Sequence, residues 1–146
     1  MKLNKKKPYA QFYSNGKIVC TGVKSEEKLK KAIIEFDNII KSSPIYTNLN
    51  LDAIVISNIS TTCDIKHKLR LQKLYSYLAE LKDPEVKVYY NSEHYPAIIY
   101  KKKVEESNMT FLFYESGKIV ITGAKKREDI FNLLNNIYPD LMKFRK

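Results

Sequence analysis

Apolar residues recur at helical spacing in three stretches of the chain. The first stretch contains Leu29, Ala32, Ile33, Phe36, Ile39 and Ile40. The second contains Leu71, Leu74, Tyr75, Leu78 and Leu81, and the third contains Ile130, Leu133, Leu134 and Ile137. This spacing predicts three amphipathic helices. Acidic residues at 26–27 and 128–129 suit the positive ends of the first and third helix dipoles, and Pro139 should end or kink the third helix.

Shorter stretches have the composition and alternation of β-strands. They cover residues 51–60 (LDAIVISNIS), 86–90 and 97–101. Strands and hairpins outnumber the helices, which predicts an α+β fold with an antiparallel sheet and helices on one face. The other face of the sheet would then be free to bind a partner.

The chain contains an internal repeat. Residues 12–24, FYSNGKIVCTGVK, match residues 113–125, FYESGKIVITGAK, at 9 of 13 positions, and all four glycines fall inside this pair. Each copy predicts a hairpin with a tight turn at Asn15-Gly16 or Ser116-Gly117. Alternation along the strand points Val120 and Thr122 to one face and Ile119 and Ile121 to the other. One face of the hairpin is then buried, and the other carries small, amphipathic side chains.

The composition is basic, with 26 Lys and Arg residues against 16 acidic ones and a formal net charge of +10. Such a charge attracts polyanions without identifying one. The two cysteines, Cys20 and Cys63, lie far apart, and neither they nor His67 and His94 have metal-binding spacing, so no metal or cofactor is expected. No apolar run is long enough for a membrane span, and we expect a soluble, intracellular protein with no membrane partner.

Several segments carry a specific resemblance to one family. They are TTCDIKHKLRLQKL at 61–74, SEHYPAIIYK at 92–101, FLFYESGKIVITGAKKREDI at 111–130 and NIYPDLMKFRK at 136–146. In order and spacing they resemble the second repeat of the TATA-binding protein family, and residues 9–41 resemble the end of its first repeat. The resemblance implies a saddle, a curved antiparallel sheet whose concave face lies on the DNA minor groove. It also implies a transcription initiation factor, and not an enzyme, that bends A·T-rich duplex DNA.

The resemblance also assigns roles to individual residues. Asn58 would offer hydrogen bonds at the groove floor. Small contacts beside it would come from Val19, Thr21, Leu112, Val120 and Thr122. Phosphate contacts would come from Lys17, Lys24, Lys101, Lys118, Lys125 and Arg127. The family's DNA-kinking phenylalanines correspond to Tyr13, Tyr95 and Tyr114, whose hydroxyls must stay hydrated or paired, and Gln11 and Ser60 replace apolar groove-facing side chains.

Partners follow from the same resemblance. A transcription factor IIB-like protein would contact the loop NSEHYP through Glu93, with Asn91 replacing a second acidic position. The RNA polymerase machinery would assemble on that complex, in the nucleus of a cell or, for a viral protein, in the host nucleus or a cytoplasmic replication site. The bias toward Lys, Ile and Asn is typical of an AT-rich genome.

The N-terminal part of the chain resembles only the closing part of the family's first repeat. We expect residues 1–50 to form a partial repeat, a hairpin plus a helix, and residues 51–146 to form a complete second repeat, together one structural domain. An unpaired edge at residues 51–60 would then be covered by the hairpin 9–22 or by a second copy of the chain. Two functions stay open: DNA binding that nucleates initiation, and a partner-binding regulator that has lost strong DNA bending.

Overall fold

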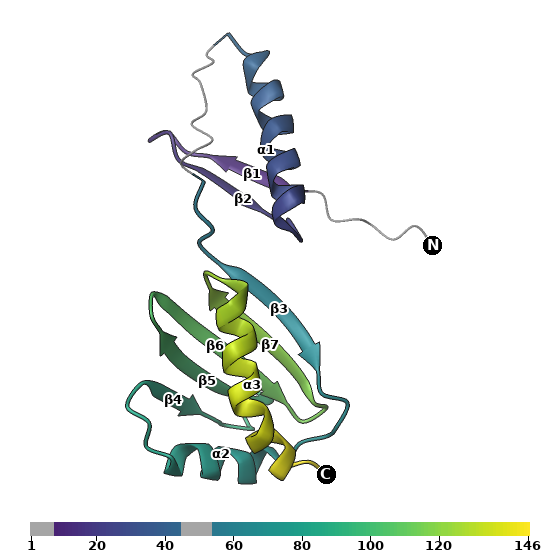
Figure 1. The fold of residues 1–146 in the computed structure, drawn as a ribbon, viewed down its shortest axis with the longest axis vertical. Coiled ribbons are helices and arrows are strands. Elements are labelled where there is room, and N and C mark those ends of the chain that lie inside the picture. Colours follow the sequence, from purple (N-terminus) through teal and green to yellow (C-terminus); the bar gives the residue numbers. More distant parts are fainter. Residues whose placement is uncertain (1–7, 45–53) are drawn as a thin grey trace. The chain divides into compact units, whose positions relative to one another are not determined.

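The computed structural model describes residues 8–44 and 54–146. The chain divides into two compact units, Met1–Ile54 and Val55–Lys146, and each is described by itself (Figure 1). That the two units form one structural domain stays a prediction.

The first unit consists of a hairpin and a helix. Strands β1 (Tyr9–Phe12) and β2 (Ile18–Thr21) pair antiparallel, and α1 (Glu26–Lys41) lies across them (Figure 1). The turn is closed by a hydrogen bond from the Gly16 amide to the Tyr13 carbonyl, 3.0 Å long. Ser25 caps the helix by accepting a hydrogen bond from the Lys28 amide, which satisfies one of the helix's unpaired N–H groups.

The second unit is built on a five-stranded antiparallel sheet. Its strands are β3 (Ile59–Asp64), β4 (Val86–Tyr89), β5 (Ala97–Val104), β6 (Ser107–Tyr114) and β7 (Lys118–Ala124). Their order in the sheet is β3-β7-β6-β5-β4. The repeated hairpin β6–β7 therefore lies in the middle of the sheet, with a neighbouring strand on each side.

Two helices, α2 (Leu71–Glu80) and α3 (Arg127–Lys143), cover one face of this sheet (Figure 1). Their apolar stripes meet the inward-facing residues of the central strands. The most deeply buried side chains are Leu69, Leu74, Ile98, Met109, Phe111, Phe113, Ile119, Ile121 and Leu141. The α+β prediction, an antiparallel sheet with helices on one face, is confirmed in this unit.

Some helix details differ from expectation. Of the two effects expected of Pro139, an end or a kink, the end is wrong. The helix α3 continues through Pro139 to Lys143. Proline removes one backbone donor, yet Ile137 and Leu141 on either side of it are both buried, so packing offsets the lost hydrogen bond. In α1, Ile39 does not join the buried stripe but is 66% exposed, and the buried Asp37, paired with Lys41, lies on that stripe instead.

The strand expected at residues 51–60 is displaced along the chain. Residues 51–53 lie outside the described residues, 54–58 are not in a strand, and β3 runs from Ile59 to Asp64. A strand extends only as far as its hydrogen-bonding partner, and β7 ends at Ala124, which pairs with Ile59. The apolar composition of residues 54–56 misled the prediction.

The hairpin of the first unit and β3 of the second belong to separate sheets. The hairpin strands β1 and β2 pair with each other in a two-stranded sheet of their own, and among the described residues β3 pairs only with β7. The expected pairing of residues 9–22 with residues 51–60 stays a prediction. Pairing between two copies of the chain also stays a prediction.

Candidate nucleic-acid interface

The sheet of the second unit leaves one face free of helices. Along the strands, residues that are half-buried or exposed alternate with core residues, and register brings them side by side. Leu112 of β6 lies between Ile99 of β5 and Val120 of β7, and Thr110 lies between Lys101 and Thr122. We call this the open face.

Asn58 lies just before β3, within a network of hydrogen bonds on the open face. Its Oδ1 accepts a 2.8 Å hydrogen bond from the Gly123 amide. An amide N–H can only donate, so this bond fixes which end of the Asn58 side chain faces β7. The Nδ2 group contacts Ser60 Oγ at 3.3 Å, and Ser60 Oγ lies 2.9 Å from Thr122 Oγ1.

Glycine is required at position 123 by the same arrangement. Its φ is +90°, and a Cβ there would lie 2.1 Å from the backbone oxygen of Asn108. Any side chain would push β7 away from β6 and remove the Gly123 amide from Asn58. The duplicated glycine therefore positions Asn58.

Tyr95 and Tyr114 form a pair at one end of the open face. Tyr114 ends β6 and Tyr95 precedes β5, and their hydroxyls are hydrogen-bonded at 2.9 Å. The rings are 6.4 Å apart between centroids and inclined at 57°. Tyr95 is 38% exposed, and the hydrogen bond to Tyr114 raises the pKa of its hydroxyl. The structure thus brings together two of the three tyrosines assigned by the resemblance.

Cations gather on the β4 and β5 side of the open face. Lys101 of β5 lies directly opposite Lys87 of β4, and its Nζ is 6.0 Å from the centre of the Tyr89 ring. Like charges placed opposite each other repel, and an anion between them would relieve that repulsion. Lys103, two residues further along β5, extends the same row.

The other assigned cations of this unit lie on β7 and after it. Lys118 is exposed and pairs in register with Asp64, while the pKa of Asp64 is lowered by hydrogen bonds from Lys66. Lys125 lies 3.6 Å from Glu106, and Arg127, the first residue of α3, is exposed. Exposed ion pairs of this kind are weak and exchange readily for a phosphate.

The assigned residues of the first repeat lie in the first unit. Lys17, Thr21 and Lys24 are exposed, and Tyr13, 49% exposed, contacts Gln11 Oε1 through its hydroxyl at 3.4 Å. Val19 is half-buried, but so are its neighbours Ile18 and Cys20. The prediction of a buried face is confirmed for β7 and wrong for β2, because among the described residues of the first unit β2 has β1 as its one strand neighbour and one helix across it.

Glu93 lies in the loop between β4 and β5. The side chain of Asn91 accepts a 3.1 Å hydrogen bond from the Glu93 amide, and the Asn91 carbonyl accepts from the amides of His94 and Tyr95. Asn91 therefore shapes this loop, and Glu93 is left exposed on it. The Asn91 side chain thus supplies the acceptor that closes the turn.

Sequence reasoning missed part of the open face. Lys87, Tyr89, Ile99, Lys103 and Thr110 lie on it, and none of them was assigned a role. The alternation in VKVY and in AIIYKKKV is the signal that would have found four of them, once β4 and β5 were paired in register. Without that register, strand neighbours cannot be read from the sequence.

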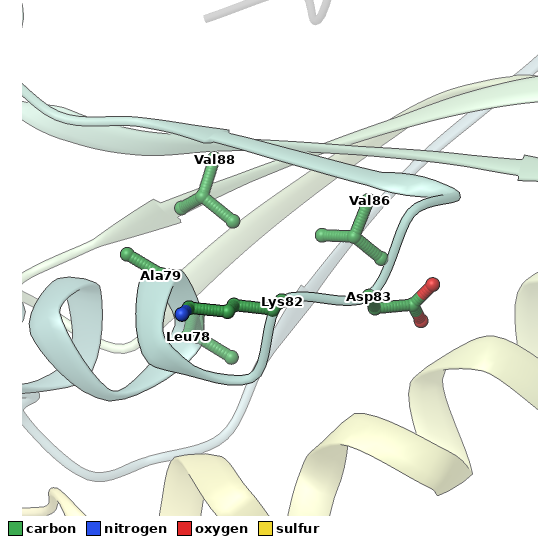
Figure 2. Close-up of a pocket in the computed structure, with 6 residues that line it drawn as sticks. All are labelled: Leu78, Ala79, Lys82, Asp83, Val86 and Val88. Carbon is green, nitrogen blue, oxygen red and sulfur yellow. The ribbon is translucent and has the colours of Figure 1, made fainter.

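The helix side of the sheet carries a small hollow between α2 and β4 (Figure 2). It has a volume of about 170 Å³ and is lined by Leu78, Ala79, Lys82, Asp83, Val86 and Val88. Asp83 is tied to Lys102 by a 3.0 Å ion pair, which also lowers the pKa of its carboxyl. In the part of the chain that the structure describes, no three His, Cys, Asp or Glu residues gather as metal ligands, both cysteines are free, and no helix could span a membrane.

These features define a class. The second unit is an α+β protein whose antiparallel sheet has one open face, which is polar at Asn58, aromatic at one end and basic along β4 and β5.

Comparison with known proteins identifies the family. The family model described as transcription factor TFIID (or TATA-binding protein, TBP) matches residues 1–43 and 53–144 of the chain. The chain is 37% identical to TATA-box-binding protein 1 of Arabidopsis thaliana, covering all of this chain and 68% of that protein, and 35% identical to the TATA-box-binding protein of Bombyx mori, of which it covers 44%. The solved structure of Methanococcus jannaschii TBP matches with a TM-score of 0.73 and 27% identity over 97% of this chain and 75% of that one. The chain belongs to the TATA-binding protein family, a family of transcription factors and not of enzymes, and has its α+β fold.

Proposed function

We propose that the chain binds A·T-rich duplex DNA in the minor groove through the open face and bends it, so that an initiation complex can assemble there. The observation that carries this proposal is Asn58, whose side-chain oxygen is occupied by the Gly123 amide. Its Nδ2 group keeps a donor for the solvent side. The minor groove of A·T pairs presents only acceptors, adenine N3 and thymine O2, to such a donor.

Neighbouring side chains support the same geometry. Leu112 and Val120 lie side by side on β6 and β7 and are half-buried, so they offer short apolar surface beside Asn58. A guanine amino group would have to be desolvated against that surface without a partner, which disfavours G·C pairs. The basic row on β4 and β5 supplies phosphate contacts at the side of the groove.

The tyrosine pair supports bending. Tyr95 and Tyr114 lie side by side at one end of the open face with their rings inclined at 57°, and either ring alone is a flat apolar wedge that can enter a base step. The hydrogen bond between the two hydroxyls gives each of them one partner and so lowers the cost of burying them, and the hydroxyl that accepts keeps its own proton for solvent.

An electrophoretic shift assay in a salt series tests DNA binding. We expect an A·T-rich duplex to bind, with affinity falling steeply as salt rises, and a G·C-rich duplex to bind much more weakly. Inosine in place of guanine removes only the minor-groove amino group and should restore part of the binding. Equal affinity for A·T-rich and G·C-rich duplexes would sink the proposal.

Bending is tested by energy transfer between dyes at the two duplex ends. Tyr95→Ala and Tyr114→Ala should each reduce the bend more than they reduce protein stability, and phenylalanine at both positions should strengthen it. The matched control is Tyr138→Ala, which removes an exposed tyrosine of α3. An unchanged bend in Tyr95→Ala and Tyr114→Ala would assign the pair to packing.

Recruitment of a transcription factor IIB-like partner, and through it the polymerase, is proposed for the loop that carries Glu93. Its exposed carboxylate suits a basic partner surface. Glu93→Lys should reduce recruitment to preformed DNA complex and leave DNA binding unchanged. A loss of DNA binding in this variant would show that the loop belongs to the groove contact instead.

One observation favours the second candidate, a partner-binding regulator. Within the described residues, β3 has a neighbour on one side only, so its other edge offers unpaired backbone groups to a second chain, including a second copy of this one. Sedimentation with and without DNA separates the candidates. A dimer that forms without DNA and does not bind duplex would favour the regulator.

A further inference from the structure

The hydrogen bonds around Asn58 form a closed ring of three members. Thr122 Oγ1 donates to Asn58 Oδ1 at 3.4 Å, and Asn58 Nδ2 donates to Ser60 Oγ at 3.3 Å. The third contact, 2.9 Å between the two hydroxyl oxygens, fits either donor by itself. Since the single hydroxyl proton of Thr122 is used on Asn58, Ser60 is the donor in the third bond.

The direction of the ring decides what it offers to the solvent side. Asn58 Oδ1 already accepts from Thr122 and from the Gly123 amide, so both its lone pairs are used. Each hydroxyl oxygen donates once and accepts once within the ring and has one lone pair left. Asn58 Nδ2 has one hydrogen left. The ring therefore presents one donor and two acceptors.

One donor and two acceptors do not complement the minor-groove edge of an A·T pair. Adenine and thymine present only acceptors in the minor groove, so they match the remaining Asn58 hydrogen and leave the hydroxyl lone pairs without a donor. A G·C pair presents the guanine amino group between two acceptors. The amino group can donate to Ser60 or Thr122 while Asn58 donates to the neighbouring acceptor.

We infer that Ser60 is a specificity-determining residue. Through its hydrogen bonds with Asn58 and Thr122, it allows the open face to accept a G·C pair at the one position of the DNA site that contacts Asn58. This inference rests on the proposed minor-groove binding and refines it. At the other steps, the apolar side chains of Leu112 and Val120 still disfavour guanine. The preferred site is thus A·T-rich with a single tolerant position.

The ring is accessible for this role. Ser60 and Asn58 are exposed and Thr122 is half-buried, all on the same side of β3 and β7. The Gly123 amide holds Asn58 in place before any ligand arrives. The guanine amino group would therefore meet acceptors that are already oriented, which reduces the cost of ordering them.

The test uses the full chain and a panel of duplexes in which one G·C pair is moved step by step through an all-A·T site. We expect affinity within about threefold of the all-A·T duplex at one position and a loss of roughly tenfold or more at the others, the usual cost of a mismatched pair. Inosine at the tolerant position should bind no better than guanine. 2,6-Diaminopurine, which adds the amino group to an A·T pair, should be tolerated at the same position and rejected elsewhere.

Variants then assign the effect to the ring. Ser60→Val replaces the hydroxyl by a β-branched apolar side chain that suits a strand, and should make the tolerant position lose roughly tenfold for guanine while all-A·T binding is unchanged or tighter. Ser60→Thr keeps the hydroxyl and should keep the tolerance. Thr62→Val, which lies on the same strand opposite Val120, is the matched control and should change nothing at that position.

Each result has a distinct meaning. Binding to all-A·T duplex with guanine rejected equally at every position would overturn this inference and leave the proposed function standing. Tolerance that persists in Ser60→Val would overturn it as well. Failure to bind any duplex would overturn the proposed function, and this inference with it.

Discussion

The two hairpins of the internal repeat share most of their residues but differ in what they are packed against. In β7, Ile119 and Ile121 are completely buried, whereas the matching Ile18 and Cys20 of β2 are only half-buried. The β6–β7 hairpin has β5 and β3 on its two sides and helices across one face. The described part of the first unit supplies one helix and no further strand. Burial is therefore a property of the neighbours and not of the hairpin sequence.

The turns, in contrast, are alike. The Gly16 amide donates to the Tyr13 carbonyl at 3.0 Å, and the Gly117 amide donates to the Tyr114 carbonyl at 2.9 Å. Both glycines have positive φ, +80° and +88°. The local sequence determines the turn in both copies, and the surroundings determine how much a change there costs.

The largest difference is expected for alanine at these two glycines. A Cβ on Gly117 would lie 2.2 Å from the backbone oxygen of His67, whereas one on Gly16 would meet nothing within 4 Å. Gly117→Ala should lower the free energy of unfolding by more than about 3 kcal/mol, and Gly16→Ala by about 1 kcal/mol from backbone strain alone. Urea denaturation followed by far-UV circular dichroism measures both, since the chain has no tryptophan. Equal losses would mean that the two turns are equally enclosed.

The next difference concerns the matching positions Ile121 and Cys20. Ile121→Ala removes a fully buried side chain from the core and should cost about 3 kcal/mol, while Cys20→Ala at a half-buried position should cost less than about 1 kcal/mol. Hydrogen exchange would assign each loss to its unit. A cost at Cys20 as large as that at Ile121 would show that β2 is covered in solution.

This comparison also explains what the sequence could predict. The helical spacing of Leu71, Leu74 and Leu78, and the duplicated glycines, are local signals, and they gave the right helix and the right turns. The start of β3 and the course of α3 beyond Pro139 depend on contacts with distant residues, Ala124 and the core around Leu141, and local pattern could not give them.

The site shows the same division. The roles of Asn58, Tyr95 and Tyr114 were assigned by resemblance and stay predictions, whereas the hydroxyl contact between Ser60 and Thr122 joins residues far apart in the chain. Ser60 was noted only as a departure from an apolar position. A hydrogen-bond partner across two strands requires the register of β3 with β7, which includes an irregularity between Ile59 and Thr61.

A smaller effect is expected at alkaline pH, where the core of the second unit contains a tyrosine. Tyr100 is 7% exposed, and burial, together with the nearby charges of Asp83 and Asp140, raises its pKa to about 12. Between the ordinary tyrosine pKa of about 10 and this value, the unfolded chain loses a proton that the folded chain keeps, so stability falls as pH rises. Tyr100→Phe should flatten the stability profile in this range. An unchanged slope would assign it to other groups.

The smallest expected change in stability is at the turns themselves. The first copy has Asn15 at the position where the second copy has Ser116. Neither residue is among the described non-glycine residues with positive φ, so each turn is a type I turn followed by a glycine in the left-handed region. The Asn15 Oδ1 accepts from the Lys17 amide at 3.1 Å, and the Ser116 Oγ accepts from the Lys118 amide at 3.4 Å.

Because both turn residues are exposed, exchanging them should have nearly equal and opposite effects whatever lies beneath each hairpin. Ser116→Asn should stabilise the second unit by about 0.5 kcal/mol through the shorter bond, and Asn15→Ser should destabilise the first by a similar amount. Hydrogen exchange at the Lys17 and Lys118 amides reports each bond directly. If the exchange at Ser116 changed stability several times more than the one at Asn15, the core would influence even the turn, and the separation of local from tertiary effects drawn from the two hairpins would be wrong.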